Sequence, residues 1–516
     1  MNIFDNLIDI KIEKNIGIAG LTDEFFAVYL NNLKKKNKNI LVVVNSLYEA
    51  NKLYSSVENY TDKVLLFPMD DFLTSEALAI SPDLEITRLE TLNKLNSNDK
   101  YIVITNLMGY LRYLPKKENY NKFLINLSVG DEIDPKKLAN LLYSSGYKKD
   151  TLVTKTGEYA VRGFVIDVFP LEGDNPVRIE FFGDEIESIR YFDPNKQSSL
   201  KKIKNIKIKP CTEFLSTKTV EENYFGKQKY LPKYEKVSNI LDYLGDSFAI
   251  FKDYEQLKIS YTNILNEVMT YQESKDLDYS GKYMFGFDEI GVDDYINYMT
   301  INNLSNKNVI NYDIKTINSF NENVDSINTY IRDCISNGKT VIICLKKHQI
   351  RNLVKNLNMK IHQTSLDKIY ENEVNIVEKD INEGFIYLNY VFLSSKELFN
   401  IKEKHKKYNT KYKYAVNISD INKLEIGDYV VHDVHGIGIY NGIKTLEVAG
   451  LLKDYIEVIY KGKDKLYIPV EKIDLLSKYS GKEGVSPKIN KLGGKEWERT
   501  KARVKARVND MADELI

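Results

Sequence analysis

The junction between the first strand and the first helix predicted for this chain is where a phosphate-binding loop would lie. Its residues, Gly17 to Glu24, read Gly-Ile-Ala-Gly-Leu-Thr-Asp-Glu. A working loop ends in Gly-Lys-Ser/Thr, because the lysine reaches the outer phosphates and the hydroxyl binds magnesium. Asp23 and Glu24 occupy those two places and would repel a triphosphate. With Gly17 and Gly20 retained, the sequence predicts a degenerate loop in which Thr22 caps an ordinary helix.

A second candidate for function is a group of arginines. Lysine is the usual cation of this chain, which has only ten arginines, yet Arg162, Arg178 and Arg190 fall within thirty residues of one another. Arginine differs from lysine in its planar fork, which binds a carboxylate through two hydrogen bonds. The local use of arginine therefore points to a binding surface.

An aromatic residue accompanies these arginines. Phe182 lies four residues beyond Arg178, so the two share one face of a strand. Arginines beside an exposed aromatic ring are typical of a protein-binding hot spot. A surface ion pair with Glu158 or Glu180 fits the same residues and would contribute little stability. Both interpretations stand at this point.

The histidines and cysteines show no convergent pattern. His432 and His435 have a His-x-x-His spacing without a third ligand, and on a strand that spacing places the two rings on opposite faces. We therefore expect no metal site. The three cysteines, Cys211, Cys334 and Cys344, form no disulfide framework, which fits the reducing cytoplasm.

Length and composition predict a multidomain α/β protein. A chain of 516 residues exceeds one hydrophobic core and predicts about three to five domains at roughly 100–200 residues each. The net charge is zero, so composition alone favours neither nucleic acid nor a membrane. The chain start resembles no signal peptide, and no apolar run reaches the roughly 18 residues of a membrane helix. We expect a cytoplasmic monomer.

Two kinds of sheet are predicted in the first 400 residues. Strands and helices alternate from 15 to 112, which indicates a parallel sheet covered by helices. From 118 to 198 the pattern becomes an antiparallel meander with a helix on one face. Residues 199–320 return to the chemistry of the first domain, and 322–397 predict a further small α/β unit.

The densest run of short strands lies at 426–469, where apolar residues alternate and glycines separate the runs. This pattern predicts a small closed β-barrel that acts as a docking module through a strand edge. The lysine-rich 399–424 predicts a flexible linker before it. After it, Trp497, Val504 and Leu515 belong to one apolar stripe of a helix.

Two of these regions resemble one protein family. The run GEYAVRGFVIDVFP, followed by VRIEFFGDEIESIRYFDP, resembles a region shared by the excinuclease protein UvrB and the bacterial transcription-repair coupling factor (Mfd). Residues 426–510 resemble the RNA polymerase interaction domain of the coupling factor, a CarD-like module. UvrB keeps an intact phosphate loop where this chain has Asp23 and Glu24, which favours the amino-terminal portion of a coupling factor.

The resemblance implies a fold and a division into domains. The fold is a degenerate P-loop-like α/β core with an inserted antiparallel α+β domain, a small α/β domain, an SH3/Tudor-like barrel and a C-terminal helix. The implied boundaries are 1–117 and 199–320 for the two halves of the core, 118–198 for the insert, 321–398 for the small domain, 399–424 for the linker, 425–490 for the barrel and 491–516 for the start of a connecting helix.

The resemblance also implies partners and contact residues. The insert binds the excinuclease protein UvrA through positions matching Arg162, Arg178 and Phe182, with Arg190 a weaker candidate. The barrel docks on the RNA polymerase β subunit through the strand 454–459, with Ile456 as the apolar contact. The polymerase-binding residues expected here are Tyr455, Ile456, Glu457 and Val458.

The implied function is that of a non-catalytic adaptor without a cofactor or metal. In the family, a translocase motor downstream uses ATP and magnesium to move on double-stranded DNA, and we expect this chain to stop before it. The alternative is an ATP-dependent DNA repair helicase related to UvrB. Nucleotide binding by residues 1–320 would favour that alternative.

Overall fold

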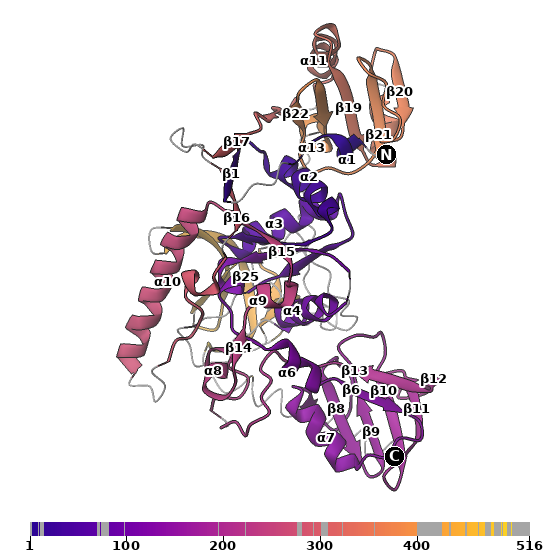
Figure 1. The fold of residues 1–516 in the computed structure, drawn as a ribbon, viewed down its shortest axis with the longest axis vertical. Coiled ribbons are helices and arrows are strands. Elements are labelled where there is room, and N and C mark those ends of the chain that lie inside the picture. The colour runs from indigo at the N-terminus through magenta and orange to yellow at the C-terminus, as the bar shows by residue number, and fades with distance from the viewer. Residues whose placement is uncertain are drawn as a thin grey trace. The chain divides into compact units, whose positions relative to one another are not determined.

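The computed structural model divides the chain into two compact units, Met1–Lys149 with Thr156–Thr410, and Asp150–Lys155 with Lys411–Ile516. It describes residues 3–8, 10, 15–69, 73, 82–97, 99–194, 196–221, 223–275, 281–292, 294–300, 308–321, 323–354, 357–399, 426–432, 435–448, 451–462, 464–469, 476–478, 487, 489–492 and 497. Figure 1 shows the fold of these residues. The C-terminal stripe predicted at 497–515 lies, apart from Trp497, outside them.

The first unit is built on a core sheet of seven parallel strands. Their order across the sheet is β17 (Val309–Asn311), β1 (Ile16–Ala19), β16 (Tyr295–Met299), β15 (Ser247–Lys252), β2 (Asn39–Val44), β4 (Ile102–Asn106) and β3 (Val64–Phe67). Strands such as β2, with sequence NILVVV, are buried along their whole length, as expected for a parallel sheet covered on both faces. Because β15, β16 and β17 come from the second half of the unit, two distant segments of chain complete one sheet.

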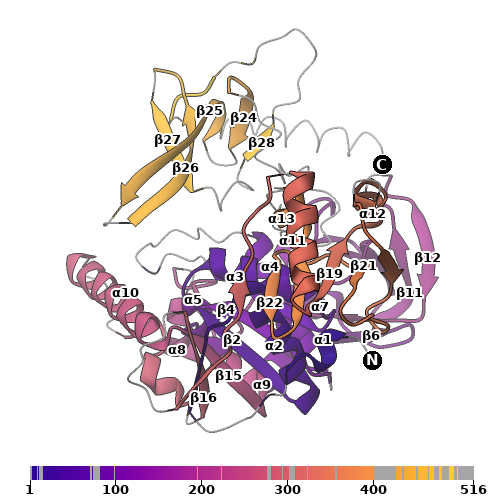
Figure 2. The same ribbon diagram turned by 90° about the horizontal axis from the view of Figure 1, so that it is seen from above.

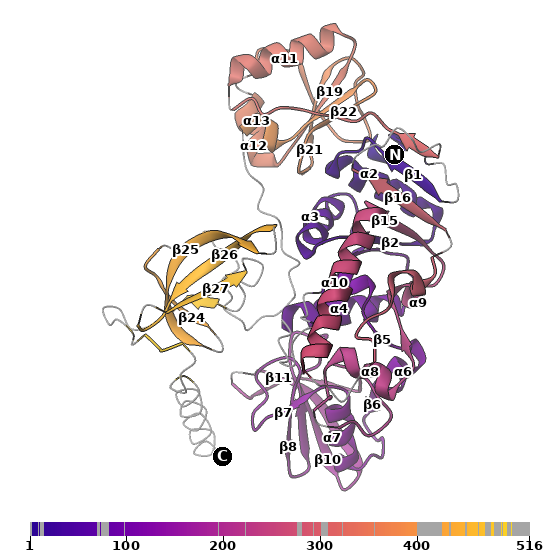
Figure 3. The ribbon, with the colours of Figure 1, turned by 90° about the vertical axis from the view of Figure 1, so that its left-hand side faces the viewer.

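Helices and short strands connect the strands of the core sheet. The helices are α1 (Ile3–Asn6), α2 (Asp23–Leu33), α3 (Leu47–Glu58), α4 (Pro82–Leu95), α5 (Leu107–Tyr110), α6 (Lys117–Lys122), α8 (Leu231–Tyr234), α9 (Ile240–Leu244) and α10 (Tyr254–Lys275), with 3-10 turns at Lys34–Lys36, Gln228–Tyr230 and Phe287–Ile290. Two strands of two residues each, β5 (Leu114–Pro115) and β14 (Val237–Ser238), pair antiparallel among these connecting elements. Long α10 stands out clearly in Figure 3.

An inserted sheet interrupts the core. Its order is β12 (Ser199–Ile203), β11 (Glu185–Phe192), β10 (Val177–Phe182), β9 (Val165–Val168), β8 (Glu158–Arg162) and β7 (Lys148–Lys149). Helix α7 (Pro135–Ser144) packs Leu138 and Leu142 into the apolar cluster beneath it. The antiparallel meander predicted within 118–198 is confirmed, with β8 to β11 as its successive strands.

The insert extends beyond the boundary that we expected at residue 198. Strand β12 pairs with β11, and β13 (Asn205–Ile208) pairs with β6 (Ile125–Ser128) at the start of the insert. The lysine–isoleucine alternation of 201–208 did not predict this boundary, because alternation indicates a strand but not the sheet that the strand joins.

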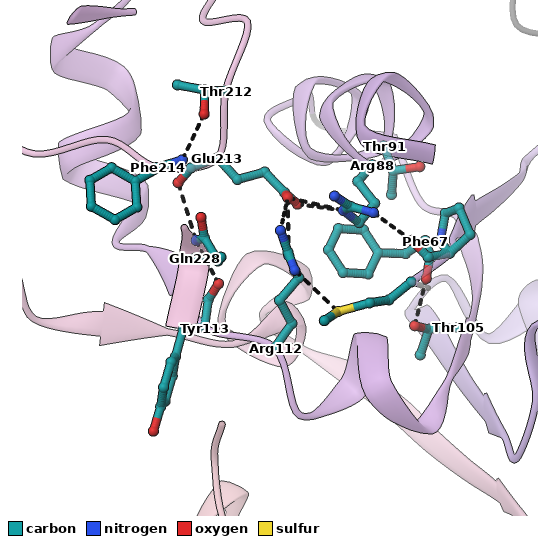
Figure 4. A network of polar contacts seen from close by, with 12 residues as sticks. Phe67, Arg88, Thr91, Thr105, Arg112, Tyr113, Thr212, Glu213, Phe214 and Gln228 are labelled. Atoms are coloured by element: carbon teal, nitrogen blue, oxygen red, sulfur yellow. Dashed lines mark hydrogen bonds and ion pairs between the residues drawn. The ribbon is translucent and has the colours of Figure 1, made fainter. Parts of the chain in front are cut away.

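A buried ion cluster fixes the exit from the insert to the core (Figure 4). Glu213 accepts hydrogen bonds at 3.0 Å from Arg88 of α4 and at 2.7 Å from Arg112 after α5. Arg88 also donates to the carbonyl of Pro68, at 3.0 Å. The Gln228 amide holds the backbone on either side of this cluster by donating to the carbonyls of Tyr113 and Glu213. All three charged side chains are buried, so the cluster is a structural joint.

The small α/β domain forms the third sheet of the unit. Its order is β18 (Lys315–Thr316), β22 (Phe385–Tyr387), β23 (Tyr390–Leu393), β19 (Thr340–Leu345), β21 (Val374–Glu378) and β20 (Ile361–Thr364), with helices α11 (Val324–Ser336), α12 (Lys347–Val354) and α13 (Ser395–Phe399). It joins the apolar core of the first sheet through Phe25 of α2, whose ring contacts Phe385 and Tyr387. Cys334 and Cys344 are buried in it, as small apolar residues.

The second unit contains the C-terminal sheet, drawn from orange to yellow in Figure 2. Its order is β27 (Lys465–Pro469), β26 (Leu451–Ile459), β25 (Gly436–Val448), β24 (Tyr429–His432) and β28 (Leu476–Lys478), all antiparallel. The closed barrel that we expected is not what these residues form. In the described part of the chain no pairing joins the end strands β27 and β28, so the sheet is open.

Candidate protein-binding surfaces

The degenerate loop is an ordinary helix start, as predicted. The Thr22 hydroxyl accepts a hydrogen bond from the amide of Phe25 at 3.2 Å and so caps α2. The backbone before Thr22 is also hydrogen-bonded. The backbone amide of Tyr312 donates to the carbonyl of Ala19, and the backbone amide of Ile314 donates to the carbonyl of Gly20. Residues 312–314, which lead to the small α/β domain, therefore lie against the loop.

The two acidic residues of this loop bind side chains of the protein itself. Asp23 lies 2.5 Å from the Lys52 ammonium and 3.5 Å from that of Lys252. Burial alone would raise the pKa of Asp23, but the hydrogen bond from Lys52 and the charge of Lys252 outweigh it and lower that pKa. Glu24 is buried and accepts from the Tyr60 hydroxyl at 2.7 Å. Lys52 and Lys252, which could otherwise bind a phosphate, thus form ion pairs with Asp23.

The outer face of the inserted sheet is organised by a buried carboxylate, Asp167. Arg178 donates to it through Nε at 2.7 Å and through Nη2 at 2.8 Å, and Arg162 donates to the same group. Arg178 also donates to Gln197 at 3.2 Å, and its guanidinium stacks over the ring of Phe192 at 4.6 Å. The hydrogen bond to Asp167 raises the pKa of Arg178 above its usual value. Arg178 is consequently fixed in place.

The third arginine has a different partner. Arg190 donates to Glu180 at 2.8 Å, and the Ser188 hydroxyl donates to the same carboxylate at 2.5 Å. Glu180 is therefore an ion-pair partner, but of Arg190. The sequence interpretation of Arg162 and Arg178 missed Asp167, whose place in FVIDVFP between buried Ile166 and Val168 was the available signal.

Exposure separates these residues into two groups. Phe182 shares its face with Arg178, as predicted from the spacing, and is 79% exposed. The Arg162 side chain is 36% exposed, whereas that of Arg178 is 15% exposed. Arg162 and Phe182 can touch a partner directly. Arg178 acts mainly by holding the surface in shape.

The strand that we expected to dock on a partner is internal to the C-terminal sheet. Strand β26 is paired with β25 on one side and, over residues 455–459, with β27 on the other, so this part of it is not an edge. Ile456 is fully buried with Val458 in the apolar cluster of this sheet. The expectation that Ile456 is an exposed contact was wrong, because the strand order depends on pairings that alternation along one strand does not reveal.

Glu457 and Tyr455 lie on the other face of β26. Glu457 accepts hydrogen bonds from Asn441, from the Tyr467 hydroxyl at 2.7 Å and from Lys465 at 3.1 Å. These bonds, led by those of Asn441 and Tyr467, lower the pKa of Glu457 to about 2. Tyr455 is half-buried. Glu457 therefore holds three strands together, with little of its surface available to a partner.

Besides its end strands β27 and β28, this sheet has an open edge along part of β25. Residues 443–448 pair with 456–451 of β26, whereas β24 pairs only with residues 436–439. In the described part of the chain no strand covers the other side of 443–448. Ile443 there is 44% exposed, and Ile426, 73% exposed, lies against Gly442 beside it. An apolar patch thus borders an open strand edge.

The two histidines lie on the same side of the chain. Their ring centroids are 4.8 Å apart, because His435 follows the end of β24 and no longer continues its alternation. The expectation of opposite faces was wrong. Burial, together with the charge of the neighbouring His435, lowers the pKa of His432 to about 4. Among the described residues no three His, Cys, Asp or Glu side chains group as metal ligands.

None of the described helices combines the length and the apolar character that a membrane span requires.

Two families match parts of this chain. Residues 125–214 match the UvrB interaction domain, and residues 424–480 match the CarD-like/TRCF RID domain. The first contains the Asp167 surface and the second contains β24 to β27. Over nearly the whole chain, the sequence is 30% identical to the transcription-repair-coupling factor of Staphylococcus haemolyticus, covering 99% of this chain and 49% of that protein.

This chain is a homologue of the transcription-repair coupling factors. The factor of Bacillus subtilis is 29% identical over 97% of this chain and 48% of its own length, and that of Staphylococcus aureus is 29% identical over 100% and 49%. The chain therefore spans about half the length of the coupling factors that it matches. Both matched domains agree with the amino-terminal portion expected from the sequence.

The candidate residues fall where the two domains match. Arg162, Arg178 and Phe182 lie inside the first match, and Tyr455 to Val458 lie inside the second. The insert boundary at about 214 in the first match agrees with the strands β12 and β13.

Proposed function

We propose that this chain is the adaptor portion of a transcription-repair coupling factor. Its C-terminal sheet docks on the β subunit of a stalled RNA polymerase, and its inserted sheet recruits the excinuclease protein UvrA to the damaged template. The observation that supports this most directly is the presence of both matched domains on one chain, each with an exposed candidate surface. The setting is the cytoplasm, and the chain acts as a monomer.

The inserted sheet supplies the UvrA site in this proposal. Arg162 and Phe182 contact the partner, and Arg178 supports them through Asp167. Aromatic and arginine side chains dominate the energetics of protein interfaces, and this face offers both within one sheet.

The C-terminal sheet supplies the polymerase site. Of the expected residues, buried Ile456 and Val458 form the apolar core of this sheet. Tyr455 and Glu457 lie on its other face. The support for docking through β25 is the open edge at 443–448 with Ile443 and Ile426 beside it. A strand added to an open edge gains backbone hydrogen bonds, and neighbouring apolar side chains give specificity.

The proposal assigns no nucleotide or metal to these residues. Lys52 and Lys252 are engaged by Asp23, and the loop backbone is covered by residues 312–314. ATP, magnesium and double-stranded DNA belong, in this proposal, to the translocase motor of the full-length family.

The test is calorimetric titration of the chain with purified UvrA. The wild-type chain is expected to bind, and the double variant Arg162→Ala, Arg178→Ala is expected to lose binding while still binding the polymerase β subunit. Because the double variant leaves buried Asp167 without its two arginines, its folding is checked by circular dichroism, and a lower thermal transition would assign the lost binding to unfolding of the insert. Unchanged binding of UvrA would refute the assignment of this surface.

A further inference from the structure

A small cavity lies beside the degenerate loop, at the carboxyl ends of the neighbouring strands β2 and β15. Its volume is about 240 Å³. The charged side chains of its lining are Asp23 of α2, Glu49 and Lys52 of α3, and Lys252 at the end of β15. Open α/β sheets bind their ligands at the carboxyl ends of the strands. The cavity is therefore where this sheet would hold a ligand, and the proposed protein-binding sites use none of these residues.

The Asp23 carboxylate lies between the two lysines of the lining. One of its oxygens is 2.5 Å from the Lys52 ammonium, and the other is 3.5 Å from the Lys252 ammonium. The lysines belong to a helix and to a strand that are distant in the sequence, so one carboxylate binds cations from two elements.

The other acids near these lysines have partners of their own. Glu49 accepts a hydrogen bond at 3.2 Å from the backbone amide of Asn45, just before α3. Glu383 of the small α/β domain acts on Lys52 through its charge, but it forms an ion pair with Lys396 at 2.6 Å. The lining carries two positive and two negative charges, so removal of Asp23 leaves it with one net positive charge.

Stabilisation of α2 alone does not account for this arrangement. An acid in the first turn of a helix stabilises the positive end of the helix dipole, and that role needs no partner side chain. The Thr22 hydroxyl already caps α2. Asp23 in addition contacts two ammonium groups of other elements and lines a cavity with them.

We propose that this cavity is a site for a small anion of the carboxylate or phosphate class, and that the chain's own Asp23 carboxylate fills it. Both classes offer negatively charged oxygens that accept charge-assisted hydrogen bonds from ammonium groups. Asp23 is thus a tethered ligand that joins α2 to α3 and β15 and excludes free phosphate. The inference goes beyond the proposed function, because it involves no partner protein.

The test is rescue of Asp23→Ala by inorganic phosphate in the complete chain. Thermal transitions are measured in phosphate and in chloride at equal ionic strength, so that screening is the same. In chloride, Asp23→Ala is expected to unfold about 2–4 °C below the wild type, as for the loss of a partly exposed ion pair. Phosphate bound to the folded state should restore at least half of this difference. The response of the wild type corrects for the general stabilising effect of phosphate.

Two further variants locate the effect. Asp246→Ala is the matched control, because it breaks an ion pair of 2.6 Å with Lys38 outside the cavity lining, and it should respond to phosphate only as the wild type does. Adding Lys252→Gln to Asp23→Ala removes one of the two lysines and should abolish the rescue. Asp23→Ser is measured as well and should be rescued even if Asp23→Ala fails to fold.

The outcomes that overturn the proposal are distinct. A phosphate response of the Asp23 variants no larger than that of the wild type and Asp246→Ala overturns the anion site. An equally large response of the wild type overturns the claim that Asp23 fills it. Rescue that persists with Lys252→Gln overturns the lysine pair. Binding of UvrA by Asp23→Ala should equal that of the wild type, so the proposed function is judged by a separate measurement.

Discussion

Arg178 lies directly opposite Arg190 on β11 and directly opposite Asp167 on β9. Like charges in directly opposed positions of a sheet destabilise it. Here Asp167 binds Arg178, and Glu180 binds Arg190, so each guanidinium is neutralised by a different carboxylate. The arginine face of the inserted sheet therefore depends on a buried residue that touches no solvent.

This relationship predicts that Asp167→Ala destabilises the insert. Without the carboxylate, Arg178 faces Arg190 and keeps neither of its two short hydrogen bonds. We expect a loss of about 3 kcal/mol or more, as when one partner of a buried ion pair is removed, measured as a lower thermal transition by circular dichroism. Asp167→Ala combined with Arg178→Leu is the matched control and should recover part of the loss. If Asp167→Ala unfolds at the same temperature as the wild type, this role of the carboxylate is contradicted.

We predict opposite effects of an aspartate substitution at two isoleucines, Ile443 and Ile456, that pair across β25 and β26. Ile443→Asp places a charge on the exposed residue and should fold normally but lose the polymerase β subunit in a pull-down. Ile456→Asp places a charge in the apolar cluster and should unfold this sheet, since burying an unpaired charge costs several kcal/mol. Lys461→Asp, at an exposed turn, is the control and should retain binding. If Ile443→Asp still retains the polymerase, this edge is excluded as the docking site.

The buried joint between insert and core predicts a large effect of a conservative substitution. Glu213→Gln removes the carboxylate that binds both Arg88 and Arg112 in the buried cluster, and we expect it to cost about 3–5 kcal/mol in urea unfolding. The control is Glu172→Gln, which breaks an exposed pair with Lys209 and should cost less than about 1 kcal/mol. Similar urea midpoints of unfolding for the two variants would mean that the buried ion cluster contributes little to the stability of the protein.

His432 predicts a pH dependence of stability. Its folded pKa of about 4 lies below the unfolded value of 6.5, so between these values the unfolded state binds more protons. Stability should therefore fall as the pH drops from about 6.5 to 4, by up to about 1.4 kcal/mol per pH unit. In His432→Gln this part of the loss should disappear, as measured by thermal unfolding from about pH 7.5 to about pH 4.5, a range that spans most of this window. An identical slope in the variant would assign the acid sensitivity to other groups.

Local features of this protein could be predicted from its sequence. Thr22 caps α2, and the strands of the meander appear as predicted, because a cap and an alternation depend on neighbours along the chain. The shared face of Arg178 and Phe182 follows from the same periodicity.

Features that depend on strand pairing could not be predicted. Alternation indicated short strands in 426–469 but could not show that β26 lies between two other strands. Likewise, Asp167 meets Arg178 only through the register of β9 with β10. The side on which His435 lies could not be foreseen, because β24 ends at His432 and a spacing rule holds only for a continuous strand.

The central claim, that one chain carries two separate binding sites, is tested most directly by sequential capture on a biosensor. The polymerase β subunit is immobilised, the chain is loaded, and UvrA is then injected. We predict a second binding step with wild type, no second step with the loaded Arg162→Ala, Arg178→Ala variant, and no loading of Ile443→Asp. A second step of wild-type size with the arginine double variant, or failure of the wild-type chain to load, would contradict the claim.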